Sequence, residues 1–188
     1  GAAAHAGAEP EKGISAILVA AEAITRMPLG RIDEETTANI GLISGGRALN
    51  IVPDLVEVKG EARSRDTARL EAQVRSMVSA FEEAAARHGA TVDVEVTRVY
   101  VGYRLGPDEP IIRLLAAGAA EVGLELNCIA TGGGSDANIF NAAGIRIVNI
   151  SCGMDKVHTT HEQIAVGEMV RCAEWLLACL RLRAASGA

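Results

Sequence analysis

The sequence predicts an α/β fold in which a small α+β domain of the ferredoxin-like type precedes a second part with α/β layering. Two observations predict this fold. Helical periodicity and strand alternation succeed one another in the first half, and apolar runs alternate with glycine-rich loops in the second. We therefore predict one domain over residues 1–105 and another over residues 106–188.

The composition favours a soluble, acidic, globular protein. Of the 188 residues, 49% are hydrophobic, which is enough for a core, and the net charge is −6. Aromatic residues make up only 3%, and no basic stripe accompanies them, so we expect no nucleic acid as a partner. No apolar run reaches the roughly 18 residues of a membrane span, so we expect no membrane either. Four cysteines in or beside apolar runs, without C-x-x-C spacing, indicate buried free thiols in a reducing cytoplasm.

In the first half, the pattern predicts two helices and three strands. The helices are expected over residues 12–27 and 66–88, and the strands over residues 38–44, 55–63 and 92–96. This α-β-β-α-β order is a ferredoxin-like unit without its first strand. We therefore expect one unpaired sheet edge and a chain that starts inside an element.

In the second half, helices are expected over residues 108–122, 136–143 and 165–182, with strands over residues 126–130 and 146–151. Two strands with three helices make a poor independent sheet. We therefore expect part of this layer to come from other polypeptide.

Residues 131–162 look like a binding site. Three consecutive glycines let backbone N–H groups approach a ligand, and either Ser135 or Asp136 can cap the helix that follows, so the loop suits an anionic group. It is not a phosphate P-loop, because Gly-Lys-Ser/Thr is absent. The next apolar run leads to a loop that holds His158, and we expect these segments to line one cleft.

Five motifs carry a resemblance to a known family. They are AHAGAEPEKGISAI at residues 4–17, GGRALNIVPD at residues 45–54, EARSRD at residues 61–66, GGGSDAN at residues 132–138 and VHTTHE at residues 157–162. Together they resemble the peptidase T-like branch of the two-zinc exopeptidases. That superfamily also holds aminoacylase, succinyl-diaminopimelate desuccinylase and glutamate carboxypeptidase, and the resemblance covers essentially the whole chain.

The resemblance implies a metallopeptidase of the aminopeptidase or tripeptidase type that hydrolyses small peptides with metal-activated water. Its lid domain would form a homodimer, and two zinc ions would lie in each active site. The resemblance covers only the lid and the C-terminal portion of the three-layer αβα zinc-peptidase domain. The upstream zinc ligands and the general base have no counterpart here, so we expect this chain to bind zinc incompletely or not at all and to be inactive alone.

The resemblance also implies residue roles. It makes His158 a zinc ligand and His5 the catalytic hydrogen-bond donor to the oxyanion. The residues implied to bind substrate are Asn50, Arg63, Gly133, Gly134 and Ser135. Arg65 is a nearby rival of Arg63. Glu162 could orient His158 or cap the last helix, and His161 has no implied role.

A second interpretation comes from a different class of protein. A ferredoxin-like domain with an exposed sheet edge could be a non-catalytic dimerisation or ligand-binding module. Metal content and an aminopeptidase assay, each with and without upstream polypeptide, distinguish the two interpretations.

Overall fold

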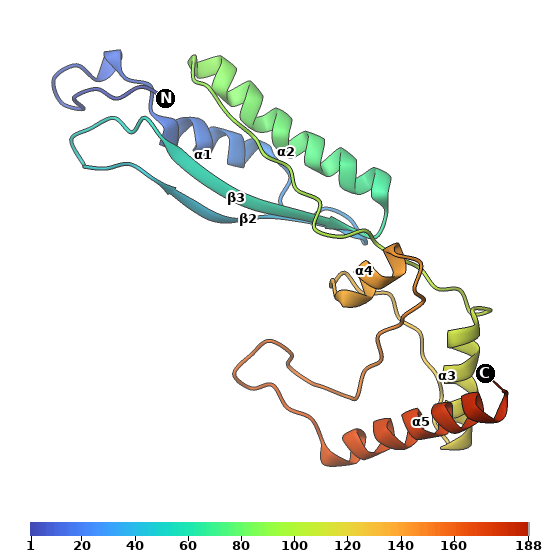
Figure 1. Cartoon of the computed structure of the whole chain (residues 1–188). Coiled ribbons are helices and arrows are strands. Elements are labelled where there is room, and N and C mark those ends of the chain that lie inside the picture. Colours follow the sequence, from blue (N-terminus) through green and yellow to red (C-terminus); the bar gives the residue numbers. More distant parts are fainter. Residues whose placement is uncertain (188) are drawn as a thin grey trace. The chain divides into compact units, whose positions relative to one another are not determined.

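The computed structural model describes residues 1–187, and these form two compact units, one over residues 1–98 and the other from Val99 onward (Figure 1). The division falls within an extended stretch, at residue 98, whereas the sequence placed it at residue 105. Each unit has its own helices. The fold is mixed α/β, as the sequence predicts.

The first unit is built from two helices and an antiparallel sheet. Its elements are α1 (Ala16–Arg26), β1 (Gly30–Arg31), β2 (Thr36–Gly45), β3 (Val56–Ser64) and α2 (Thr67–His88). The strand order is β1-β2-β3, with a register shift between Ile40 and Leu42 in the long β2–β3 pair. A β-bulge of this kind increases the local twist of a ribbon.

Helices α1 and α2 both pack on one face of the β2–β3 ribbon (Figure 1). The alternation in β3 explains the choice of face, because Glu57, Lys59, Glu61 and Arg63 alternate with Val56, Val58 and Ala62. The buried core lies between the two helices and the ribbon. It consists of Val19, Ala23, Met27, Ala80, Ala84 and Ala85, with Ile40, Met77 and Phe81 packed against it.

Side-chain caps and an ion cluster hold the two helices in place. Ser15 caps α1 and Asp66 caps α2, and each accepts a backbone N–H of its own first turn. Near the end of α2, Glu22 of α1 accepts hydrogen bonds from His88 and Arg87. The hydrogen bond from His88 is the main cause that lowers the pKa of the Glu22 carboxyl below its ordinary value.

The second unit contains α3 (Pro110–Glu121), α4 (Asp136–Ala142) and α5 (Val166–Ala185). Helices α3 and α5 cross closely, and a Cβ added at Gly118 would overlap Sγ of Cys179. The Trp175 indole N–H also donates to the Leu115 carbonyl at 2.9 Å. A glycine in the middle of α3 therefore allows this close crossing.

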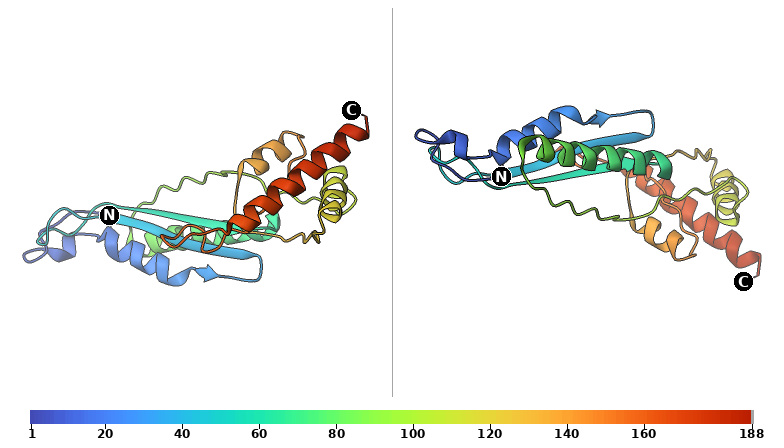
Figure 2. Two further views of the ribbon diagram at one scale, coloured as in Figure 1. Left: turned by 90° about the horizontal axis from the view of Figure 1, so that it is seen from below. Right: turned by 90° about the horizontal axis from the view of Figure 1, so that it is seen from above.

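Three predicted strands do not form. Residues 92–96, 126–130 and 146–151 contain no strand in the described structure. In both views of Figure 2, the yellow-green segment after α2 runs beyond β3, on the side away from β2. A strand needs a neighbour within hydrogen-bonding distance, and alternating valines alone do not supply one. The alternation thus predicted the extended backbone correctly and the pairing wrongly.

Two further findings concern surfaces. None of the helices that the structure describes is long and apolar enough to cross a membrane.

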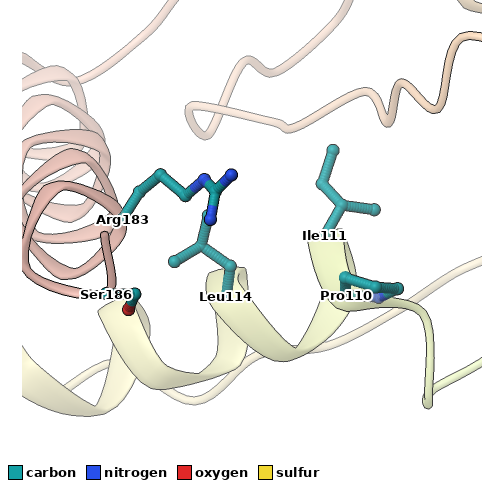
Figure 3. A pocket seen from close by; sticks show the side chains of 5 residues that line it. All are labelled: Pro110, Ile111, Leu114, Arg183 and Ser186. Carbon is teal, nitrogen blue, oxygen red and sulfur yellow. The ribbon is translucent and has the colours of Figure 1, made fainter. Parts of the chain in front are cut away.

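A groove of about 440 Å³ lies between the start of α3 and the end of α5 (Figure 3). Its lining residues are Pro110, Ile111, Leu114, Arg183 and Ser186. It contains none of the predicted site residues.

Candidate functional site

The structure brings the segments of His5 and Asn50 together, although 45 positions separate the two residues in the sequence. The Ala6 N–H donates to the Asn50 carbonyl at 2.9 Å, and His5 and Ile51 form an antiparallel bridge. Next to these pairs, the Val52 N–H donates to the Ala4 carbonyl at 2.9 Å. Main-chain atoms therefore fasten the His5 segment to the loop that links β2 and β3.

The other side of the His5 segment is fastened as well. Ala2 and Ile14 exchange two backbone hydrogen bonds of 2.9 Å each, which close the intervening loop. A 3₁₀ turn at Pro10–Lys12 completes the loop. The segment that carries His5 is thus ordered on both sides, and the ring itself is exposed.

The His5 ring has a defined hydrogen-bond pattern. Its Nδ1 atom accepts the N–H of Gly7 at 3.2 Å and the N–H of Ala8 at 3.1 Å. A nitrogen that accepts hydrogen bonds carries no proton, so the proton of the neutral ring lies on Nε2. The ring is therefore a donor at Nε2.

Arg63 lies at the other end of β3 from the His5–Asn50 contact. It pairs with Thr37, whereas Val56 pairs with Gly45 next to the connecting loop, so roughly 20 Å of strand separates the two ends. The Arg63 guanidinium donates from Nε and Nη2 to both oxygens of Glu61, at 3.1 and 2.8 Å. Arg63 therefore binds a carboxylate bidentately in this structure, and this carboxylate belongs to Glu61, two residues earlier in the same strand.

In the second unit, the glycine loop leads directly into α4. Ser135 is the N-cap, and its Oγ accepts the Ala137 N–H while Asn138 Oδ1 accepts the Ser135 N–H at 3.0 Å. This is a capping box with Asn in the third position. Of the two candidate caps, the structure selects Ser135 over Asp136. Asn149 also donates to Ser135 Oγ at 2.7 Å, which ties the loop to the following extended segment.

Two residues at the glycine loop escaped sequence reasoning. The Tyr100 ring packs against Gly134 so closely that a Cβ at position 134 would overlap it. Next to it, the Val101 carbonyl accepts from Asn138 Nδ2 at 2.9 Å. Tyr100 follows the strand predicted over residues 92–96, and no local pattern shows that this segment contacts the glycine loop.

His158 lies in a loop closed by hydrogen bonds between Asp155 and Gln163, at 2.9 and 3.1 Å. Lys156 and His158 have φ values of 52° and 66°, in the left-handed region that non-glycine residues rarely occupy. The His158 N–H donates to Glu162 Oε2 at 2.8 Å. Glu162 thus holds the backbone of His158, and it does not cap α5, whose N-cap residue Ala165 makes no side-chain cap.

The described residues do not fit a complete zinc site. Nowhere in residues 1–187 do three His, Cys, Asp or Glu side chains gather closely enough to hold a metal ion. His158 is a single candidate ligand, and a zinc site needs about three protein ligands or more. No hydrogen bond or ion pair joins His158 to the glycine loop within this part of the chain.

Comparisons with known proteins agree with the motifs. Residues 1–89 match the M20 peptidase dimerisation domain. The uncharacterised protein YqjE of Bacillus subtilis is 46% identical over 180 residues, which cover 96% of this chain and 48% of that protein. The chain therefore spans about half the length of this curated relative.

Two solved structures are similar over nearly the whole chain. The aminopeptidase PepT of Bacillus cereus is 45% identical with a TM-score of 0.84, over 95% of this chain and 48% of that one. A tripeptidase of Staphylococcus aureus is 40% identical with a TM-score of 0.89, over 96% and 48%. Residues 1–89 thus match a peptidase dimerisation domain, and over nearly its whole length the chain is similar to an aminopeptidase and a tripeptidase.

Proposed function

We propose that this chain is the dimerisation and peptide-gripping part of a peptidase that cleaves small peptides, as an aminopeptidase or tripeptidase does. The observation that carries the proposal is the main-chain pairing of the His5 segment with the loop that holds Asn50, where two motifs of the resemblance meet within residues 1–89. The likeness to an aminopeptidase and a tripeptidase supports it over 95% and 96% of the chain.

The proposed roles follow the local chemistry. His5 donates from Nε2 to the carbonyl oxygen of the scissile peptide bond, where negative charge develops during hydrolysis. Arg63 binds the substrate carboxylate with the fork that now holds Glu61, so substrate must compete with that side chain. Gly133, Gly134 and Ser135 contact the opposite end of the peptide.

The metal and the partner belong to the same proposal. His158 would supply one ligand to a zinc ion in the whole enzyme, and the remaining ligands and the general base would come from polypeptide outside this chain. The dimerisation domain would pair with a second copy of itself. Four free cysteines suit a reducing cytoplasm, where we place the enzyme.

Complementation tests the proposal. The purified chain is mixed with the part of the S. aureus tripeptidase that it does not match, and hydrolysis of tri-alanine is measured with zinc present. We expect turnover in the mixture only, and we expect His158→Ala to abolish it while His161→Ala, the matched control, retains it. Turnover by the isolated chain would contradict the incomplete site.

A second measurement addresses the alternative function, a non-catalytic dimerisation module. Sedimentation equilibrium gives the oligomeric state of the isolated chain. A dimer that neither hydrolyses tri-alanine in the mixture nor binds it would favour a non-catalytic dimerisation module over a peptidase.

A further inference from the structure

We propose that the backbone N–H groups of Gly7 and Ala8 position His5 as a dedicated hydrogen-bond donor, by fixing its neutral ring with the proton on Nε2. In this state His5 is neither a metal ligand nor a general base. The identity of the acceptor, a peptide carbonyl oxygen, rests on the proposed function, whereas the tautomer does not.

The hydrogen-bond pattern selects the tautomer. A neutral imidazole has one N–H donor and one acceptor nitrogen. Nδ1 lies 3.2 Å from the Gly7 nitrogen and 3.1 Å from the Ala8 nitrogen, and both of these donate to it. The opposite tautomer would place a third N–H against these two and lose both hydrogen bonds, so we expect at least about a tenfold excess of the Nε2–H form.

The surrounding backbone keeps the two donors in place. The pairs Ala2–Ile14 and Ala4–Val52 close the loop on both sides, and the Glu9 N–H donates to the His5 carbonyl at 3.1 Å. None of these contacts requires a glycine at position 7. A Cβ there would lie 3.6 Å from the nearest ring atom of His5, which is an ordinary contact. The N–H groups, and not side chains, therefore set the ring.

The consequence is that His5 and His158 differ in which ring nitrogen has a free lone pair. A metal ion or a transferred proton needs a lone pair, and the exposed nitrogen of His5 carries a hydrogen instead. The His158 ring accepts no hydrogen bond in the described part of the chain, so a lone pair is available there. The structure thus assigns His5 to an oxygen acceptor and leaves metal binding to His158.

Nitrogen NMR of the imidazole rings tests the assignment directly on the whole chain. Spectra are recorded about two pH units above the ordinary imidazole pKa, where neutral rings dominate. We expect His5 Nδ1 to resonate as an unprotonated nitrogen and Nε2 as a protonated one. His161, whose ring makes no hydrogen bond among the described residues, serves as the reference for a mixture of tautomers. A protonated Nδ1 in His5 would overturn the proposal.

Two variants of one position separate the N–H group from the side chain. Ala8→Pro removes one donor, and Ala8→Gly keeps it. We expect the Nδ1–H fraction of His5 to rise at least about threefold in the proline variant and to stay unchanged in the glycine variant. Gly7→Ala, which keeps its N–H, should also leave the tautomer unchanged. Equal tautomer fractions in all four proteins would contradict the role of these amides. Gly7→Pro removes the other donor and should raise the Nδ1–H fraction as well, so the test does not depend on Ala8→Pro alone.

A zinc titration and a peptide titration complete the test. Added zinc should leave the ring signals of His5 in place, and a zinc-bound His5 would overturn the proposal. Added tri-alanine should shift the His5 Nε2 proton. If it does not, the proposed peptidase role loses its support, while the tautomer result stands on the spectra of the free chain.

Discussion

The Tyr100 ring occupies the space where a side chain at Gly134 would lie. Because the ring fills this space, we expect Gly134→Ala to destabilise the second unit by about 1–3 kcal/mol. Gly133→Ala is the matched control, since a Cβ at Gly133 meets nothing within 4 Å. Urea unfolding measures both, and Gly134→Ala should cost little when it is introduced into Tyr100→Ala, where the ring is absent. Equal stability of the two alanine variants would contradict the contact.

Gly118 has the same role between two helices. A Cβ there would overlap Cys179 Sγ and would lie 3.1 Å from the Cys179 backbone nitrogen, which cannot move without shifting α5. We expect Gly118→Ala to lower the free energy of unfolding by about 1–2 kcal/mol, despite the better helix propensity of alanine. Gly167→Ala, in open space near the start of α5, should instead be neutral or raise it by up to about 1 kcal/mol.

The hydrogen bond from His158 to Glu162 should be visible in hydrogen exchange. Glu162→Ala removes the acceptor, so we expect the His158 N–H to exchange about tenfold faster or more. Glu162→Gln keeps an acceptor oxygen and should preserve most of the protection. If Glu162→Gln speeds exchange of the His158 N–H as much as Glu162→Ala does, the charge of Glu162 and not its hydrogen bond holds His158 in the left-handed conformation.

Glu22 should make the first unit sensitive to acid. Its folded-state pKa is lowered, chiefly by the hydrogen bond from His88 and also by Arg87 and Arg26, so the folded chain binds this proton less tightly than the unfolded chain. Its contribution is complete above the unfolded pKa and is lost as the pH falls through the folded pKa. Unfolding measured against pH should therefore show a steeper acid loss in the wild type than in Glu22→Gln. Parallel curves would contradict the linkage.

The cysteines should differ in reactivity. Burial is the main cause that raises the pKa of the Cys179 thiol, and Cys179 lies in the α3–α5 contact, so it should react slowest with a disulfide reagent. Cys128 is exposed and should react first. Rates followed by mass spectrometry check this order, and Cys128→Ser should remove the fast phase. A fast phase at Cys179 would show that α3 and α5 separate readily.

Local patterns predicted the helices and the β2–β3 ribbon well, because spacing and caps act within a few residues. The strand at residues 36–45 and the helix at residues 67–88 differ from their predicted bounds by only a few positions. The three failed strands depend on a neighbour elsewhere, and periodicity carries no information about that neighbour. The free thiols were predicted correctly, but Cys128 is exposed and not buried.

The sequence named candidate site residues but could not predict their contacts. The motifs pointed to His5 and Asn50, yet main-chain bridges bring their two segments together, and such bridges leave no mark in the sequence. Tyr100 lies outside every motif and reaches the glycine loop only through the fold. The role of Glu162 needed the backbone geometry of His158, which no spacing rule encodes.

The bridges that fasten the His5 loop use peptide groups only. Random substitution at exposed neighbours such as Ala3 and Ala8 should therefore be tolerated over evolutionary time, provided that proline is avoided. Distant homologues are then expected to keep the backbone conformation of this loop after its sequence has diverged. Sequence alignments will therefore underestimate the similarity of homologues in this segment.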